Sequence, residues 1–333
     1  MSSLRNHFEQ ILESAGVQVN GSNPWDITVH NEELFSRISR DGTVGLGEAY
    51  MDGWWDCESI DEMITRSFRA GLEDKIRSNF KFFIYLIGLR LMNRQSESRA
   101  FQVAEQHYDI GNDIFERMLD KHMNYSCGFW ESANCLEDAQ IAKMEMICEK
   151  LQLERGMKVL EIGCGWGALA RWMSQRYGVS VTGITVSKEQ AKLARSRCAG
   201  LPVSIELADY RALNGEYDRI VSVGMLEHVG QKNYRTYFAK AKSLLKDQGL
   251  FLLHTIGAGR GGFATDRWIE KYIFPNGVLP PADALAKTAG EFFTIEDWHN
   301  FGADYDPTLM AWYENFNRSW VDLKTSYSDR FKR

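Results

Sequence analysis

Long apolar runs, paired cysteines and an excess of positive charge are all missing from this sequence of 333 residues. No segment reaches the roughly 18 apolar residues that a membrane-spanning helix needs. The first residues, MSSLRNHFEQILESAG, contain no apolar signal core, so nothing predicts export. The net charge is −6 and no basic nucleic-acid-binding module is recognisable, which argues against nucleic acid as a partner.

The cysteines of this chain form no CxxC pair, which excludes the usual signature of a zinc site or a redox-active dithiol. Most of them fall inside predicted helices and strands, so we expect reduced thiols, no bound metal and a cytoplasmic protein. The hydrophobic fraction of 44% is sufficient for the core of one large or two ordinary domains. The six cysteines are Cys57, Cys127, Cys135, Cys148, Cys164 and Cys198.

Two catalytic signatures are also absent. The sequence contains neither the GxSxG of many serine hydrolases nor the HExxH of zinc proteases, since Glu227 and His228 are adjacent without a second histidine at helical spacing. A Cys–His nucleophile pair is conceivable, but Cys127 has no visible helix terminus to activate it. Hydrolase and metalloenzyme functions are therefore weakly supported.

The segment VLEIGCGWG, from Val159 to Gly167, is the most informative feature that is present. An apolar strand ends in Glu161 and leads into a loop with glycine at every second position, which lets the backbone approach a ligand closely. The spacing is GxGxG, without the GxGxxG of dinucleotide sites or the Lys-Ser/Thr of a P-loop. The pattern favours a cofactor without phosphates, typically S-adenosylmethionine, although such loops also occur as plain turns.

Strand and helix patterns alternate from Met157 onward, which predicts an α/β fold with a mostly parallel, Rossmann-like sheet. Ser187 and Gln190 form a capping box at the start of one of the helices. Helices are predicted over residues 135–151, 168–177, 187–199 and 234–245. Strands are predicted over residues 158–162, 180–185, 203–207, 217–223 and 249–255.

Three segments are expected along the chain. Residues 1–75 form a small helical N-terminal domain, 76–104 a helical linker, and 105–333 the catalytic domain. An aromatic, proline-interrupted insertion near 257–315 is expected to cover the cofactor and bind an apolar substrate. In the linker, the apolar stretch from Phe82 to Leu89 has basic residues on both sides, so it suits either a buried helix or a membrane interface.

Polar residues at the predicted strand ends are candidates for the site. Thr185 and Gln190 stand where dinucleotide enzymes carry an acid, and they offer neutral hydrogen bonds instead. Asp209 and Tyr210 are placed to meet an adenine, although Asp209 also suits an Asx turn. Four further residues, each with an ordinary structural explanation, are expected near the reaction centre: Cys127, Glu227, His254 and Tyr305.

Almost the whole chain resembles the cyclopropane-fatty-acyl-phospholipid synthases, relatives of the mycolic acid cyclopropane synthases. Methyltransferases in general share only the glycine loop, whereas the other motifs are particular to this family. These motifs are GLGEAYMDGWW, EQHYDIGNDIF, NYSCGFW, GITVSKEQ, RIVSVGMLEHVG, LLHTIG, KYIFPNGVLP and DWHNFGADYDPTLMAWY. The resemblance implies a class I S-adenosylmethionine-dependent methyltransferase that transfers a methylene group to the cis double bond of an acyl chain in a membrane phospholipid.

The resemblance also implies how the reaction proceeds. The alkene attacks the sulfonium methyl group, a carbocation forms on the neighbouring chain carbon, and a base removes a proton so that the ring closes. In similar enzymes the base is a bicarbonate ion, held by the residues matching Cys127, Glu227, His254, Tyr305 and the backbone of Ile256. We hypothesise that aromatic faces of Phe274, Phe301 and Trp312 stabilise the cation and exclude water.

For the cofactor, the resemblance implies contacts from two short segments and several strand ends. The matching positions are Tyr125, Ser126, Glu161, Gly163, Gly165, Thr185, Gln190, Asp209 and Tyr210. The resemblance further implies a homodimer. With a lipid substrate, we expect a cytoplasmic enzyme bound peripherally to the inner face of the membrane, and a membrane-facing role for Phe82 to Leu89 becomes more favoured.

One departure from the family pattern concerns the C-terminus. Family members continue past the segment matching SDRFKR with a further helix and a closing strand, so we expect a sheet that lacks an edge strand or is completed differently. Two other functions stay open, and the departure at the C-terminus bears only on the second. One is a lipid C-methyltransferase that does not close the ring, and the other is an inactive lipid- or cofactor-binding fragment.

Overall fold

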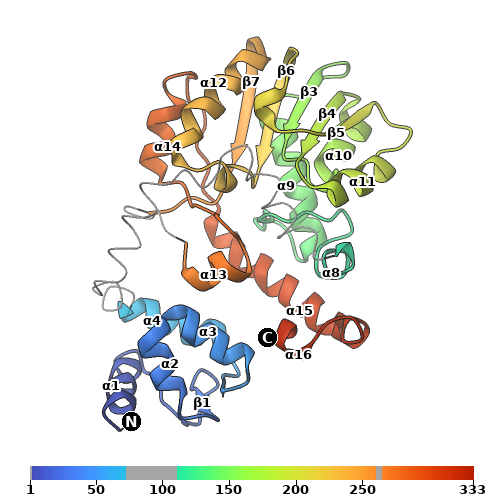
Figure 1. The fold of residues 1–333 in the computed structure, drawn as a ribbon. Helices are drawn as coiled ribbons and strands as arrows, with labels where there is room; N and C mark the ends of the chain where they lie inside the picture. The colour runs from blue at the N-terminus through green and yellow to red at the C-terminus, as the bar shows by residue number, and fades with distance from the viewer. Residues whose placement is uncertain (1, 73–110, 260–264) are drawn as a thin grey trace. The chain divides into compact units, whose positions relative to one another are not determined.

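The computed structural model describes residues 2–72, 111–259 and 265–333, which form two compact units (Figure 1). The first unit contains the described residues up to 72, together with Asp266–Ile273 and Lys324–Arg333. The second contains the described residues between 111 and 265, together with Phe274–Leu323. Two segments that the sequence analysis placed in the catalytic domain thus belong to the first unit. The expected linker, with Phe82 to Leu89, lies outside the described residues.

The second unit is built on a parallel sheet of five strands in the order β5-β4-β3-β6-β7. Its strands are β3 (Lys158–Ile162), β4 (Ser180–Thr185), β5 (Val203–Leu207), β6 (Tyr217–Val223) and β7 (Leu245–His254). The predicted Rossmann-like class is confirmed, and β5 and β7 are the edge strands of the described sheet. β7 begins earlier than predicted because Leu245 pairs with Tyr217 before a register shift.

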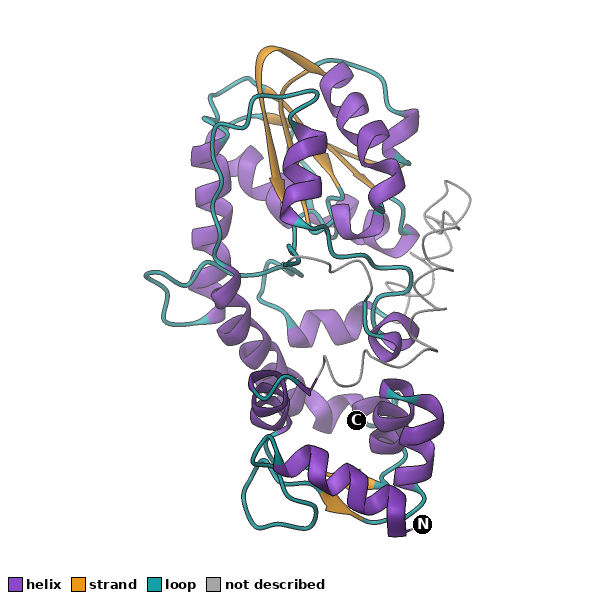
Figure 2. Ribbon diagram, turned by 90° about the vertical axis from the view of Figure 1, so that its left-hand side faces the viewer, coloured by secondary structure: helices purple, strands orange, loops and turns teal. Residues whose placement is uncertain are grey.

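Helices cover both faces of this sheet (Figure 2). The helices of the unit are α8 (Asn112–Met118), α9 (Leu136–Lys150), α10 (Ala168–Tyr177), α11 (Lys188–Arg197), α12 (Tyr234–Leu244), α14 (Ala282–Ala289) and α15 (Tyr305–Leu323). None of the helices in the described parts of the chain combines the length and apolar character that a membrane span requires.

Successive side chains of β3 point to opposite faces of the sheet and therefore pack against different helices. Leu160 and Ile162 pack with the buried aromatic residues of α12, whereas Val159 packs with α9 and α10. Because successive strand residues point to opposite faces, Glu161 points to the same face as Val159. The last acidic residue of the strand is therefore directed toward the α9 and α10 layer rather than toward solvent, and only 4% of its surface is exposed.

The strand order also predicts where a ligand binds. The chain proceeds outward from β3 to β4 and β5 on one side, then returns to β6 and β7 on the other. The crevice at such a reversal, beyond the carboxyl ends of the strands, is the usual ligand site of an open α/β sheet. The glycine loop after β3 lies at this point.

The first unit has its own apolar core, formed by residues such as Leu34, Ala49 and Trp55. Its elements are α1 (Ser2–Glu13), β1 (Thr28–Val29), α2 (Leu34–Asp41), α3 (Thr43–Met51), β2 (Trp55–Asp56), α4 (Ile60–Arg69), α13 (Arg267–Tyr272) and α16 (Asp329–Lys332). The GLGEAYMDGWW motif forms α3 and the turn into β2, so most of this glycine-rich stretch is helical.

Helix α13 packs against α3 within this unit, and the contact explains a glycine in the motif. A Cβ at Gly47 would lie 2.3 Å from the Trp268 ring, which is too close for any other residue. Glu48 accepts hydrogen bonds from Lys271 Nζ at 2.5 Å and from the Tyr272 hydroxyl at 2.8 Å. These partners hold the pKa of Glu48 down to about 2, so α3 carries a charge that anchors α13.

Candidate active site

The glycine loop is held against the end of β4 by its backbone. The N–H groups of Gly163 and Cys164 both donate to the carbonyl oxygen of Ile184, at 3.0 and 2.9 Å. Gly163 has a φ of 86°, and a Cβ there would lie 3.0 Å from the Cβ of Met225. Both the left-handed backbone and the close approach of Met225 therefore require glycine at this position.

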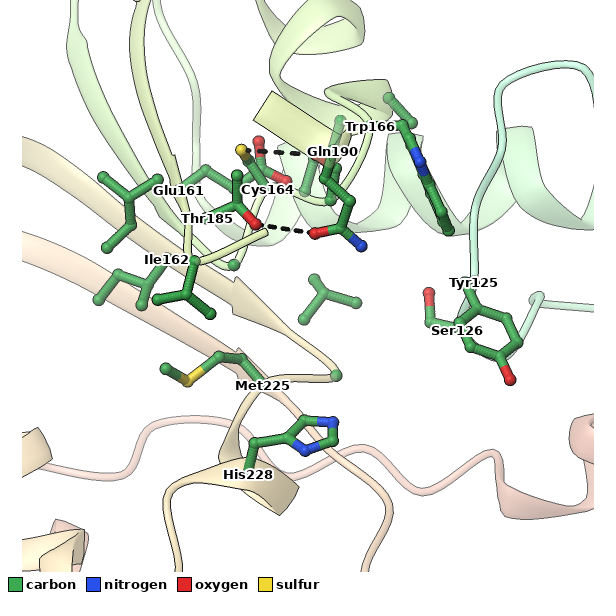
Figure 3. A pocket seen from close by; sticks show the side chains of 18 of the residues that line it. Tyr125, Ser126, Glu161, Ile162, Cys164, Trp166, Thr185, Gln190, Met225 and His228 are labelled. Carbon is green, nitrogen blue, oxygen red and sulfur yellow. Dashed lines mark hydrogen bonds between the residues drawn. The ribbon is translucent and has the colours of Figure 1, made fainter. Parts of the chain in front are cut away.

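A cavity opens beside this loop at the carboxyl ends of the strands (Figure 3). Its lining includes every residue predicted from the sequence to contact the cofactor. These are Tyr125, Ser126, Glu161, Gly163, Gly165, Thr185, Gln190, Asp209 and Tyr210. The fold therefore brings together positions that are up to 85 residues apart in sequence, from Tyr125 to Tyr210. Their contacts with a cofactor stay a prediction.

Thr185 and Gln190 are paired across the start of α11. The Thr185 hydroxyl donates to Gln190 Oε1 at 2.8 Å, and Ser187 caps the helix by accepting from the Gln190 backbone N–H at 3.2 Å. The predicted capping box thus has the expected cap. Because the amide oxygen of Gln190 is used by Thr185, its amide nitrogen is the group left to donate toward the cavity (Figure 3).

Asp209 and Tyr210 have structural roles at the end of β5 as well as a place in the cavity wall. Asp209 Oδ1 accepts from the Arg211 backbone N–H at 2.9 Å, which is the Asx turn considered as an alternative. The Tyr210 ring packs edge-on against Tyr237 at 5.2 Å, and the Arg211 guanidinium lies 5.0 Å from the Tyr210 centroid. The ring of Tyr210 is therefore largely committed to the core.

Glu161 is a buried carboxyl group with an unused oxygen. Its Oε2 has no hydrogen-bond partner among the described residues. Burial raises the pKa of Glu161 to about 8, although the Ala170 backbone N–H and the Lys143 ammonium act in the opposite direction. An unpaired carboxyl in a cavity wall is costly, and a cationic ligand would relieve that cost.

Aromatic rings surround Tyr125 on the other side of the cavity. Tyr125 stacks on Phe274 with centroids 6.3 Å apart and contacts Trp312 at 5.2 Å and Phe115 at 5.3 Å. Burial raises the pKa of Tyr125 to about 12, so its hydroxyl stays protonated. Two of the three aromatic residues that we hypothesise to shield a cation therefore meet at Tyr125.

The residues predicted for the reaction are brought together by a second set of contacts. Glu227 lies in a short 3₁₀ turn after β6, and its Oε1 accepts a hydrogen bond from the Ile256 backbone N–H at 2.7 Å. Glu227 is 7% exposed, and burial raises its pKa. His254 ends β7 two residues before Ile256, so the ends of β6 and β7 supply three of these residues.

Cys127 and Tyr305 are far apart in the sequence but interact within the second unit. Burial is the main cause that raises the pKa of Tyr305, and Glu227 and Cys127 act in the same direction. The next residue, Gly128, donates its N–H to the Thr308 hydroxyl at 3.1 Å, which holds α15 against this segment. Tyr305 is the first residue of α15.

His254 faces the third of the hypothesised shielding residues. Its ring lies 5.1 Å from the Phe301 ring, and its Nδ1 has no hydrogen-bond partner among the described residues. Burial and the charge of Lys143 lower the pKa of His254 to about 3. The imidazole is therefore neutral at ordinary pH and a very weak base.

The thiol of Cys127 is protonated rather than nucleophilic. It is 1% exposed, its Sγ donates to the Gly128 carbonyl oxygen at 3.3 Å, and burial raises its pKa to about 11. A catalytic cysteine needs a depressed pKa, so the Cys–His hydrolase alternative has no support here. Cys127 and His254 are thus uncharged polar groups, and so is Tyr305, whose pKa both Glu227 and Cys127 raise.

None of the predicted reaction residues is among the residues that line the cofactor cavity. The two groups are nevertheless continuous, because Cys127 directly follows Ser126 in the chain and Tyr125 influences the pKa of Tyr305. The geometry thus separates a ligand cavity from an adjacent cluster of neutral polar groups.

Sequence reasoning missed a buried lysine in the cavity wall. Lys143 of α9 is 2% exposed, and its Nζ donates to Ser126 Oγ at 2.7 Å and to Gln140 Oε1 at 2.5 Å. Gln140, Lys143 and the apolar Ile147 recur at helical spacing along one stripe of α9. Because Gln140 and Lys143 lie on the same face of α9 as the apolar Ile147, this spacing could have indicated that both polar side chains are buried.

Comparisons with known proteins identify the family of this chain. A sequence model of the mycolic acid cyclopropane synthetase family matches residues 95–333. The cyclopropane-fatty-acyl-phospholipid synthase of Escherichia coli is 55% identical over 97% of this chain and 85% of its own length. The tuberculostearic acid methyltransferase UfaA1 of Mycobacterium tuberculosis is 31% identical over 92% of this chain and 77% of its own length.

A solved structure shows the same fold. The mycolic acid cyclopropane synthase CmaA1, in complex with SAH and CTAB, superposes with a TM-score of 0.64 at 31% identity. The match covers 69% of this chain and 89% of that structure.

Proposed function

The chain belongs to the mycolic acid cyclopropane synthetase family, and from this membership we propose that it makes cyclopropane fatty acids. It transfers a methylene group from S-adenosylmethionine to the cis double bond of unsaturated acyl chains in membrane phospholipids. The observation that carries this proposal is the 55% identity to the E. coli synthase over 97% of the chain. The cavity and the adjacent polar cluster supply the chemical support.

The residues of the cavity fit S-adenosylmethionine, which carries an ammonium, a carboxylate and a sulfonium but no phosphate. Glu161 offers the unpartnered oxygen that a cationic group requires. Thr185 and Gln190 provide neutral hydrogen bonds where a ribose would lie. The glycine loop leaves room for the close approach of a ligand to the backbone.

The polar cluster fits a small anion such as bicarbonate. Glu227 Oε2 and His254 Nδ1 are buried without a partner among the described residues. Burial raises the pKa values of Cys127 and Tyr305, so the thiol and the phenol hydroxyl stay protonated and add no negative charge beside an anion. We therefore propose that these residues, with the Ile256 backbone, hold bicarbonate.

When bound, S-adenosylmethionine supplies an electrophilic methyl group and bicarbonate supplies a base. The protein's part is to hold the acyl double bond in line with the methyl group and to exclude water. His254 is neutral and its Nδ1 is buried without a partner among the described residues, so we propose that it hydrogen-bonds the base rather than acting as the base itself. The carboxyl group of Glu227 is able to accept and return a proton.

Positive charge develops on the acyl chain when the alkene attacks the methyl group. Phe274 and Trp312 contact Tyr125, which lines the cofactor cavity. Phe301 contacts His254, which belongs to the residues predicted for the reaction. Aromatic faces therefore lie next to both groups of residues. Such faces stabilise a cation without reacting with it. We propose that these rings protect the cationic stage until the proton is removed.

The identity to a named methyltransferase supports an alternative function, a lipid C-methyltransferase that does not close the ring. A relative named as a tuberculostearic acid methyltransferase is 31% identical to this chain. The identity to the E. coli synthase is much higher, at 55%. Ring closure is therefore the function that we propose.

The site of action follows from the proposed substrate. Phospholipid acyl chains are confined to the bilayer, so we propose a cytoplasmic enzyme that binds peripherally to the inner membrane surface as a homodimer. The homodimer rests on the family resemblance alone. Flotation with phospholipid vesicles and sedimentation analysis test these two parts of the proposal separately.

Transfer of label to lipid tests the proposed function. Incubation of the protein with methyl-labelled S-adenosylmethionine and vesicles of cis-unsaturated phospholipid is expected to place label in the acyl chains. Vesicles of saturated phospholipid are the control and should remain unlabelled. Binding of the cofactor without any label in lipid would instead identify a catalytically silent binding protein.

A further inference from the structure

Lys143 is a buried lysine in the wall of the cofactor cavity, and burial lowers the pKa of its ammonium group to about 8, which leaves it mostly protonated at neutral pH. Its charge acts on a cavity residue and on a predicted reaction residue, since it lowers the pKa of Glu161 and of His254. Removing an ammonium group from water is costly, so its retention here implies compensation. Hydrogen bonds from Lys143 to Ser126 and Gln140 offset part of this desolvation cost.

The hydrogen bond between Lys143 and Ser126 fixes the role of the serine hydroxyl. An ammonium group only donates, so Ser126 Oγ accepts from Lys143 Nζ at 2.7 Å. The Ser126 hydroxyl hydrogen is then directed away from Lys143 and is available to an acceptor. Ser126 lines the cavity and its side chain faces that space (Figure 3), so the available acceptor is a group on the ligand.

The surrounding segment is held rigidly enough to keep this orientation. Gln140 Nε2 donates to the Ser126 carbonyl oxygen at 2.9 Å, while Gln140 Oε1 accepts from Lys143 at 2.5 Å. Gln140 is fully buried, at 0% exposure, and Ser126 is 8% exposed. One turn of α9 therefore fixes both the backbone and the side chain of Ser126.

Lys143 and Glu161 place an ammonium group and a carboxyl group in the wall of one cavity. The amino-acid end of S-adenosylmethionine carries opposite charges, on its ammonium and its carboxylate. We propose that Lys143 is a positioning residue that orients the Ser126 hydroxyl to donate a hydrogen bond to the cofactor carboxylate, while Glu161 receives the ammonium. This inference rests on the proposed function, because it assumes that the cofactor is S-adenosylmethionine.

A pair of ligands that differ only in the carboxylate tests this role. Titration calorimetry would compare S-adenosylhomocysteine with its decarboxylated analogue, S-adenosyl-3-thiopropylamine. Lys143→Met is expected to weaken S-adenosylhomocysteine binding by roughly 10- to 100-fold, as for the loss of a buried hydrogen bond with a charged partner. Binding of the decarboxylated analogue should be unchanged or tighter, because a buried cation has been removed near its ammonium.

Ser126→Ala provides a second variant that keeps the lysine and the helix. It is expected to show the same selective loss for S-adenosylhomocysteine, and Lys143→Met should add little in the Ser126→Ala background. Equal weakening of both ligands by either variant would contradict the inference and indicate a structural role. Additive losses in the double variant would also contradict it, because Lys143 would then act independently of Ser126.

The same titrations separate this inference from the proposed function. If the wild-type protein bound neither ligand, the assignment of the cofactor would be wrong and the inference would fall with it. If the wild-type protein bound S-adenosylhomocysteine but the variants showed no selectivity for the carboxylate, only the role of Lys143 would be wrong.

Discussion

Glu227→Gln is expected to lower kcat by roughly 100- to 10,000-fold, the range for loss of a group that transfers protons or stabilises charge in the transition state. The amide has the shape of the carboxyl group and still accepts the hydrogen bond that the Ile256 N–H donates at 2.7 Å. It is unable to exchange a proton. Cofactor affinity should stay within roughly twofold of wild type, because Glu227 does not line the cofactor cavity.

The measurement is turnover with unsaturated phospholipid vesicles, paired with the Kd for S-adenosylhomocysteine. Glu149→Gln is the matched control, since Glu149 is an exposed carboxylate on α9, and it should leave both quantities unchanged. Equal losses of turnover and affinity in Glu227→Gln would mean that Glu227 binds the cofactor or supports the fold instead.

Glu161→Gln is expected to weaken cofactor binding by roughly 10- to 100-fold while stabilising the ligand-free protein. Affinity falls because a neutral amide replaces the carboxylate that we propose to receive the ammonium. Stability rises because the carboxylate is buried, has one unpartnered oxygen and is 4% exposed. Such opposite effects are typical of a binding-site residue that destabilises the ligand-free fold and forms its favourable interaction only when the ligand is bound.

The pH dependence of this stabilisation has a definite sign. Burial raises the pKa of Glu161 from 4.5 to about 8, so the folded protein binds more protons than the unfolded chain between these values. The contribution of Glu161 to stability is therefore lost as pH rises through this window. Relative to wild type, Glu161→Gln should gain on the order of 3 to 4 kcal/mol between pH 5 and pH 8.

Urea unfolding of both proteins without cofactor, at these two pH values, measures the difference. A variant that was less stable than wild type at both values would contradict this account. Glu161 would then be a structural anchor, and its loss of cofactor binding would have to be attributed to a damaged fold.

The parts of the fold that sequence reasoning located were those with strong local signals. The strand of VLEIGCGWG, its glycine turn and the Ser187 cap depend on residues close together in sequence, and the predicted bounds of β3 and α10 agree with the structure. Resemblance to a family added positions such as Tyr125 and Ser126, which the fold then placed in the wall of the same cavity as Glu161. Their roles toward a ligand still await the experiments above.

The remaining features depend on contacts between distant residues. Nothing near Gly47 in the sequence shows that Trp268 packs on it, so the membership of α13 in the first unit was not predictable. Lys143 was missed for a related reason. A lysine within a helix is normally taken as solvent-exposed, and its burial depends partly on Ser126, which lies 17 residues earlier in the sequence.

The most direct test of ring formation uses S-adenosylmethionine with a trideuterated methyl group and vesicles of cis-unsaturated phospholipid. Ring closure removes one deuteron, so mass spectrometry should show a gain of CD₂ in an acyl chain that no longer reacts as an alkene. An acyl chain that kept all three deuterium atoms, or that retained a double bond after gaining the carbon, would contradict the assignment as a cyclopropane synthase.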